Sequence, residues 1–364
     1  MNRNEIYVIF QPQDTDNSYW TRLLSEGIRS YAAELSYSIH PIDTDNKEIL
    51  KNLYGCPVIV AGNENNWLTA TLNKLLELNL HPIVTDASTL SSYKYKCSSV
   101  VFEIENIIHH CVKLLKSAGK EKTVFLGANP TSVTDKVKCS IFGKSGETIW
   151  ASEKIESCVD EFVSSVEKNS YDSVICANDT VAVCLMHKLV HTGCKVPDDL
   201  YIIGMGNSFI GSVLEVPLTS VWFDYFRMGV TAAGLYLNLL KNGGDFHANV
   251  SLPCKLIVRQ SAPILHKQNA HLRRKQSTIT DSVYFSGDNI QNILRVEAML
   301  QASGETDREI LYSIARKESY DTISEKIFLC DRAIRYRISK LIAKYGFKSK
   351  EELEKALRYA INDE

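Results

Sequence analysis

The sequence has no apolar run close to the ~20 residues that a membrane-spanning helix needs. Its ten cysteines include no Cys-x-x-Cys pair. His109, His110 and Cys111 are adjacent, so on a helix they would point in different directions and could not share a zinc ion. Residues 1–5 lead directly into an apolar strand, without the apolar core of a signal peptide. We therefore expect a cytoplasmic protein with reduced cysteines, no metal, no cofactor and no membrane contact.

Catalytic motifs are also missing. Gly204 and Gly206 lack the third glycine of a dinucleotide-binding loop, and no Walker, Ser-His-Asp or metal-ligand spacing is present. We therefore expect no enzyme. The apolar content of 45%, the charged content of 23% and the net charge of −2 are those of a soluble globular protein. A chain of 364 residues is too long for one ordinary core and suggests two or three.

Apolar strands and amphipathic helices alternate through the first two thirds of the chain. This order predicts an α/β fold with parallel sheets and right-handed crossovers. The expected strands are residues 6–10, 58–61, 81–85, 99–102, 123–126, 173–177 and 200–204, and the clearest helices are residues 19–35, 104–116 and 180–192. Asn178 and Asp179 follow a strand directly, at the end where open α/β sheets bind ligands.

Residues 171–261 resemble the effector-binding half of LacI/GalR-type repressors, which share their fold with periplasmic sugar-binding proteins. The resemblance rests on Asn178 and Asp179, on residues 216–221, on Asp224, and on Met228 with Gly229; it continues through residues 252–253 and 256–259. It implies a two-lobed periplasmic-binding-protein-like sensor over residues 1–265, with a small molecule bound between the lobes.

The same resemblance implies a ligand-binding set. In the first lobe, Asn17, Tyr19 and Trp20 would close over the ligand. In the second lobe, Asn178 and Asp179 would bind its hydroxyl groups. Trp222 and Asp224 would face the cleft from the hinge. Two of them have simpler alternatives, because Asn178 could cap the following helix and Trp222 could fill the core.

The chain departs from sugar-responsive relatives at two places. Those relatives usually carry an arginine before a glycine where this chain has residues 134–140, and two aspartates where it has Gly206 and Asn207. The effector class therefore stays open. It could be sugar-like, nucleoside-like, another polyol or a protein, and ligand binding could also have been lost.

The chain changes character after residue 265. Residues 266–287 are polar and basic, including Arg273, Arg274 and Lys275, and indicate a linker that could also touch DNA phosphates. Residues 288–304 follow as a connecting or dimerising helix, with an apolar stripe of Ile290, Ile293, Leu294, Ala298 and Met299.

Residues 305–364 are expected to form a small all-α domain. Residues 330–350 hold seven Lys or Arg and one Asp. They include a helix over 331–345, with Asp331 as its N-cap and Gly346 as its stop. One side of that helix is apolar at Ile334, Ile338, Leu341, Ile342 and Tyr345. The other side and its flanks carry the candidate DNA-binding residues Arg332, Arg335, Tyr336, Arg337, Ser339, Lys340 and Lys344. A merely solvated basic face is the alternative.

A short helix over 320–328 precedes the basic helix by a tight turn, which predicts a helix-turn-helix. The region resembles the LuxR/GerE-type helix-turn-helix at Arg308-Glu309, Leu311, Ile314-Ala315, Ile323, residues 331–335 and residues 338–347. It departs from that family at Lys317 and Ala333, where glycine and threonine are usual.

Together these features predict a ligand-responsive, one-component transcription regulator. It would bind DNA as a homodimer through its C-terminal domain and a small-molecule effector between its lobes. The alternative is a cytoplasmic small-molecule-binding or interaction protein whose C-terminal helices dock a protein partner.

Overall fold

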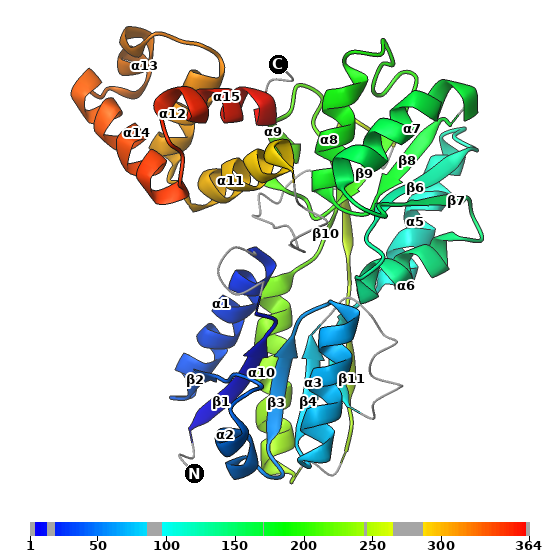
Figure 1. Cartoon of the computed structure of the whole chain (residues 1–364), viewed down its shortest axis with the longest axis vertical. Coiled ribbons are helices and arrows are strands. Elements are labelled where there is room, and N and C mark those ends of the chain that lie inside the picture. Colours follow the sequence, from blue (N-terminus) through cyan, green and yellow to red (C-terminus); the bar gives the residue numbers. More distant parts are fainter. Residues whose placement is uncertain are drawn as a thin grey trace.

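The computed structural model describes residues 4–12, 19–85, 97–169, 171–243, 246–264 and 287–361. It has two α/β lobes, one above the other in Figure 1, and a C-terminal helical module beside the upper lobe. The two-lobed α/β fold predicted from the sequence is confirmed. Of the predicted basic linker, residues 266–286 lie outside the described residues.

Lobe 1 is built on a parallel sheet of order β11-β5-β4-β3-β1-β2. Its central strands are fully buried, because helices cover both faces of the sheet. The strands are β1 (Glu5–Phe10), β2 (Ser38–Pro41), β3 (Pro57–Ala61), β4 (His81–Thr85), β5 (Ser98–Phe102) and β11 (Asn249–Leu252). The helices are α1 (Tyr19–Glu34), α2 (Lys47–Asn52), α3 (Asn65–Glu77) and α10 (Tyr225–Lys241).

Helices α1 and α10 pack against each other at the closest distance that their backbones allow. A Cβ atom added to Gly27 would lie 2.0 Å from the carbonyl oxygen of Phe226, and one added to Gly229 would lie 2.1 Å from that of Leu24. Only glycine fits at these two contacts. This helix pair covers lobe 1 beside β1 and β3 (Figure 1).

Lobe 2 has the sheet order β12-β10-β9-β8-β6-β7, with β12 antiparallel to β10 and the other pairs parallel. The strands are β6 (Thr123–Ala128), β7 (Glu147–Trp150), β8 (Ser173–Cys176), β9 (Tyr201–Met205), β10 (Thr219–Trp222) and β12 (Lys255–Ile257). The helices are α5 (Ile104–Ser117), α6 (Val133–Phe142), α7 (Ile155–Asn169), α8 (Asp179–Leu189) and α9 (Phe209–Val213).

The chain passes between the lobes at three places, from β5 to α5, from β10 to α10 and from β11 to β12. These passages lie next to one another near the middle of the molecule (Figure 1). Aromatic rings pack there, with Phe102 centred 5.2 Å from Phe223 and 5.3 Å from Tyr225.

The C-terminal module contains α11 (Asp288–Ala302), α12 (Glu305–Ala315), α13 (Tyr320–Ile327), α14 (Asp331–Tyr345) and α15 (Lys350–Ile361). The prediction that Asp331 caps α14 was wrong. The N-cap is Cys330, which has extended backbone angles, while Asp331 is the first helical residue and pairs with Arg335. Gly346 ends α14 in the left-handed conformation, as predicted.

Candidate functional site

Asn178 and Asp179 lie at the carboxyl end of β8, where the sequence placed them. Asn178 caps α8, because its side-chain oxygen accepts the N–H of Val181 at 3.0 Å. Asp179 is buried, and its two oxygens accept the Ser220 hydroxyl and the Ser208 N–H, each at 2.5 Å. Burial raises the pKa of Asp179, and these hydrogen bonds oppose the rise. Both side chains are therefore already engaged within lobe 2.

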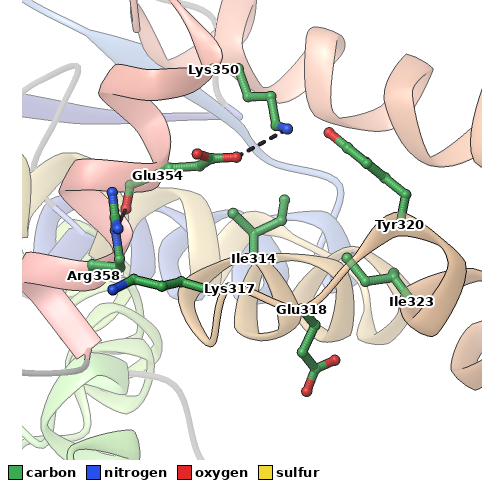
Figure 2. A pocket seen from close by; sticks show the side chains of 8 residues that line it. All are labelled: Ile314, Lys317, Glu318, Tyr320, Ile323, Lys350, Glu354 and Arg358. Carbon is green, nitrogen blue, oxygen red and sulfur yellow. Dashed lines mark hydrogen bonds and ion pairs between the residues drawn. The ribbon is translucent and has the colours of Figure 1, made fainter.

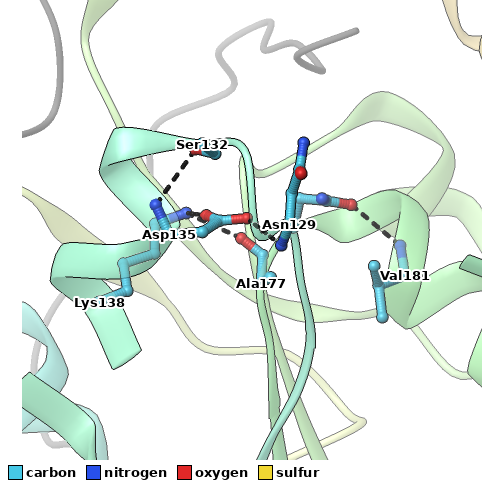
Figure 3. Close-up of polar contacts among 7 residues, drawn as sticks. Asn129, Ser132, Asp135, Lys138, Ala177 and Val181 are labelled. Carbon is cyan, nitrogen blue, oxygen red and sulfur yellow. Dashed lines mark hydrogen bonds and ion pairs between the residues drawn. The ribbon is translucent and has the colours of Figure 1, made fainter. Parts of the chain in front are cut away.

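A buried ion pair lies beside them, between the ends of β6 and β8 (Figure 3). Lys138 donates to Asp135 at 2.8 Å and to the carbonyl oxygen of Ala177 at 2.9 Å. Asp135 also accepts the N–H of Asn129 at 3.0 Å, and Ser132 caps α6. Sequence reasoning missed this cluster, although the acid and the base stand three residues apart on one helix. Because the two charges cancel, the pair carries no net charge.

The two lobes touch directly next to this ion pair. The N–H of Asn65, at the start of α3, donates to the carbonyl oxygen of Thr131 at 3.0 Å, and the N–H of Val133 donates to that of Asn63 at 2.9 Å. Glu64 and Ser132 thereby form an isolated antiparallel bridge between the lobes. The bridge fixes the separation of the lobes at this point.

Polar side chains of lobe 1 support its half of the bridge. Gln11, at the end of β1, accepts the N–H groups of Asn63 and Glu64 at 3.1 and 3.0 Å. The Glu64 carboxylate caps α3 through the N–H groups of Asn66 and Trp67. Hydrogen bonds within lobe 1 therefore hold the loop of Asn63 and Glu64 in place at the bridge.

The structure brings Trp20, Trp222 and Asp224 to the passages between the lobes. Trp20 is buried, with its ring centroid 5.9 Å from that of Tyr225. Trp222 is buried beneath the ammonium group of Lys255, which lies 5.1 Å from its ring centroid. Asp224 caps α10 by accepting the N–H of Arg227 at 3.1 Å.

The side chains of two residues in the predicted ligand set lie outside the described part of the chain. Tyr19 begins α1, and its side chain lies outside the described residues, as does the whole of Asn17. The residues of the set that the structure does describe follow β8, border the passages between the lobes or cap their helices.

Helix α14 separates into a buried side and an exposed side. Ile334, Ile338 and Leu341 are buried in the core of the module. The exposed side carries six of the seven predicted DNA-binding residues, namely Arg332, Arg335, Tyr336, Ser339, Lys340 and Lys344. Two contacts orient Arg335: its guanidinium pairs with Asp331 at 2.9 Å and lies 4.3 Å from the ring centroid of Tyr320.

Arg337, the seventh, is only partly exposed and lies on the flank of the helix. It forms a 2.7 Å ion pair with Asp307 of α12. A groove of about 480 Å³ runs along this flank, lined by Ala302, Ser303, Asp307, Ala333, Tyr336, Arg337, Lys340, Leu341, Lys344 and Tyr345.

A smaller hollow of about 200 Å³ lies between α12, α13 and α15 (Figure 2). Tyr320 points into it toward Lys350, which pairs with Glu354 at 3.1 Å. The Lys350 ammonium group lies 4.4 Å from the Tyr320 ring centroid. Tyr320 thus contacts cations of both α14 and α15, which fixes the start of α13 relative to the basic helix.

The described ranges show neither a candidate metal cluster nor a membrane span. They contain no group of three His, Cys, Asp or Glu side chains arranged to hold a metal ion. Within the same ranges, no helix combines the length and the apolar character that crossing a bilayer requires.

Comparisons with known proteins show what the α/β part resembles. Residues 112–262 match the family described as periplasmic binding protein-like domain. The chain is 30% identical over 93 residues to the HTH-type transcriptional repressor PurR of Histophilus somni, covering 26% of this chain and 28% of that protein. It is 22% identical over 269 residues to catabolite control protein A of Staphylococcus aureus, covering 68% of this chain and 78% of that protein.

The chain thus spans less than a third of the length of the PurR relatives that it matches. Solved structures show the same fold over a longer stretch. The Lac repressor bound to ONPG superposes with a TM-score of 0.59 at 18% identity, covering 72% of this chain and 83% of that one. The transcription regulator CcpA of Lactococcus lactis gives a TM-score of 0.57 at 17% identity, covering 71% and 100%. The α/β part of the chain therefore has the fold of these proteins.

Proposed function

We propose that this chain is a ligand-responsive transcription regulator that binds DNA through its C-terminal module. The observation that carries the proposal is the exposed cationic side of α14. This helix follows α13 by a short turn and lies at the outer edge of the C-terminal module (Figure 1). A helix of this kind fits a major groove, where arginine reads guanine and lysine holds phosphate. The module is of the LuxR/GerE helix-turn-helix type.

The α/β part is the sensor. A small molecule binds between the lobes, against the loops that follow β6, β8 and β9. The neutral Asp135–Lys138 wall supports an uncharged, hydroxyl-rich effector, sugar-like or nucleoside-like. PurR and CcpA are named as regulators, and one relative of this fold was solved as a Lac repressor dimer bound to operator. By analogy this chain acts in the cytoplasm as a homodimer on a two-fold operator and catalyses no reaction.

A second function is favoured by one observation. Phe328, in the turn before α14, is 92% exposed, and Tyr336 on α14 is 69% exposed. Two exposed aromatic rings on one module also suit a protein partner. In this alternative the C-terminal helices dock that partner instead of DNA.

A mobility-shift assay with the DNA upstream of the chain's own gene separates the two functions. The wild type is compared with Arg332→Ala/Arg335→Ala at two salt concentrations. Lys355→Ala is the matched control, because it removes an exposed cation of α15 in the same module. The proposal expects a shift that the double variant loses and the control keeps. It also expects affinity to fall with salt at a slope of about −0.9 per phosphate contact. A shift insensitive to the double variant contradicts it.

A further inference from the structure

Helix α11 is attached to lobe 2 by a buried carboxylate. Glu297 is 3% exposed, and its oxygens accept the N–H groups of Phe209 at 2.7 Å and Ile210 at 2.6 Å. These are the first two residues of α9, whose N–H groups have no partner within a helix. The side-chain amide of Gln301 donates to the same carboxylate. Glu297 of the C-terminal module therefore supplies the hydrogen-bond acceptors for the start of α9 in lobe 2.

Other contacts surround this attachment. The guanidinium of Arg308, on α12, lies 4.8 Å from the ring centroid of Phe209, and Arg308 also donates to the carbonyl oxygen of Leu300 at 2.7 Å. The ring of Tyr359, on α15, meets that of His187, on α8, edge to face at 4.8 Å. Three helices of the module thus touch lobe 2, which agrees with their positions in Figure 1.

The apolar core is continuous across the same boundary. Ile210 and Leu214 of lobe 2 belong to one buried cluster with Ile293 and Val296 of α11 and with Leu357 of α15. Residues of lobe 1 belong to a separate cluster. The module consequently shares its interior with lobe 2 and not with lobe 1.

The same turn of α9 is hydrogen-bonded to the carboxyl edge of the lobe 2 sheet. The N–H of Ser208, one residue before Phe209, is accepted by Asp179. The N–H of Asn207 is accepted by the Ser220 hydroxyl at 2.8 Å, and that hydroxyl donates to Asp179. Residues 207–210 therefore run from the carboxyl edge of the lobe 2 sheet to the attachment of α11 without an intervening flexible segment.

We infer that Glu297 is the positioning residue that holds the C-terminal module on lobe 2, so that module and lobe move as one body. A displacement of residues 207–210 by a ligand in the cleft is then passed through Glu297 to α11 and to the basic helix. The position of that helix relative to lobe 1 changes with the angle between the lobes. The regulatory meaning of this inference rests on the proposed function, whereas the attachment itself does not.

Hydrogen exchange on the full chain tests the attachment. The variants are Glu297→Ala, the isosteric Glu297→Gln, and the control Glu309→Gln, which neutralises an exposed acid of α12. Glu297→Ala should speed exchange at the amides of Phe209, Ile210 and α11 at least tenfold, while the amides of β9 keep wild-type rates. Glu297→Gln retains one acceptor and should give an intermediate increase, and the control should give none.

Small-angle scattering of the same variants measures whether the module leaves lobe 2. We expect a larger radius of gyration for Glu297→Ala than for the wild type and the control. Unchanged exchange in α9 and α11 together with an unchanged radius would overturn the inference. If Glu297→Ala does not fold, the comparison of Glu297→Gln with Glu309→Gln decides by the same readouts.

The DNA assay keeps this result separate from the proposed function. If the wild type binds no DNA but Glu297→Ala loosens α9 and α11, the function fails and the attachment stands. If Arg332 and Arg335 are required for DNA binding but Glu297→Ala leaves exchange unchanged, the function stands and the inference fails.

Discussion

Asp179 and Glu297 bind neighbouring main-chain amides of a single turn, Asp179 that of Ser208 and Glu297 those of Phe209 and Ile210. One carboxylate comes from the carboxyl edge of the lobe 2 sheet and the other from the C-terminal module. Each is buried, and the negative charge of Asp179 contributes to raising the pKa of Glu297. Their shared turn is where lobe 2 and the C-terminal module meet.

The stability of the protein should fall as the pH rises through neutrality. Burial raises the pKa of Glu297 from 4.5 to about 7, so the folded chain holds a proton that the unfolded chain releases. The bound proton adds about 3 kcal/mol to the free energy of unfolding, at ~1.4 kcal/mol per pKa unit. This contribution is complete below pH ~4.5 and is lost as the pH rises through ~7. Urea unfolding between pH 5 and 8 measures it. Glu297→Gln should flatten the profile, and Glu309→Gln should not; a steep profile in Glu297→Gln would show that other groups cause it.

Adding one methyl group between α1 and α10 should destabilise lobe 1. Gly229→Ala places a Cβ 2.1 Å from the carbonyl oxygen of Leu24, and neither backbone can yield cheaply. We expect a loss of about 1–3 kcal/mol in the free energy of unfolding. Gly234→Ala is the matched control on α10, because its nearest neighbour would lie at 3.5 Å and alanine favours a helix. Equal stability of the two variants would contradict this packing.

Replacing Phe328 by glycine should stabilise the module. Phe328 ends α13 in the left-handed conformation at φ +56°, which glycine adopts without the steric penalty of a side chain. The expected gain is about 1 kcal/mol, measured by thermal unfolding. Gly346→Ala, at φ +70° after α14, should lose a similar amount. If Phe328→Gly also weakens DNA binding, the ring is retained for that contact at the expense of stability.

Removing the charge of Asp307 should strengthen DNA binding. Asp307 pairs with Arg337 on the flank of α14 and adds a negative charge to the groove beside it. Asp307→Asn leaves Arg337 available to phosphate, so affinity should rise several-fold and depend more steeply on salt. Glu309→Gln, on the same helix but outside the groove lining, is the control. A lower affinity for Asp307→Asn would show that the pair orients Arg337 for binding.

Breaking the buried pair in lobe 2 should cost more than replacing both partners. Lys138→Met leaves the Asp135 carboxylate buried without its cation, at a cost of about 3–5 kcal/mol. The double variant Asp135→Asn/Lys138→Met removes both charges and keeps an acceptor for the N–H of Asn129. It should recover part of the loss in urea unfolding. A double variant less stable than Lys138→Met would mean that the pair itself stabilises the lobe.

The strongly periodic elements could be predicted from sequence. The bounds of α14 agree with expectation, because an apolar stripe defines the helix and Gly346 ends it. Helix α11 begins where expected and ends at Ala302, two residues before the end of the predicted segment. The five-residue helix α9 was not predicted, since so short a segment has no detectable period. Asp331 was predicted to be the N-cap, but it is the first residue of the helix. Aspartate is common at both positions, so the sequence does not separate them.

The candidate site could be predicted from the sequence less completely than the fold. That Asn178 and Asp179 follow a strand could be derived from the order of elements, but not that Asp179 is enclosed by Ser208 and Ser220 from two other segments. Glu297 interrupts an apolar stripe, which was the available signal, yet its partners on α9 are distant in sequence. Pairings of this kind depend on tertiary packing that no local pattern encodes.

The common core of lobe 2 and the module has a consequence for recombination between proteins. In the sequence, lobe 2 and the C-terminal module look like separate domains joined by a polar segment. A domain boundary would therefore be placed near residue 287. In the structure, a cut at this boundary would strip the cover from Ile293 and Val296 and leave Glu297 facing solvent. Transferring the C-terminal module to another protein therefore requires transferring the surface of α8 and α9 as well. The unit that folds together is larger than the sequence boundary suggests.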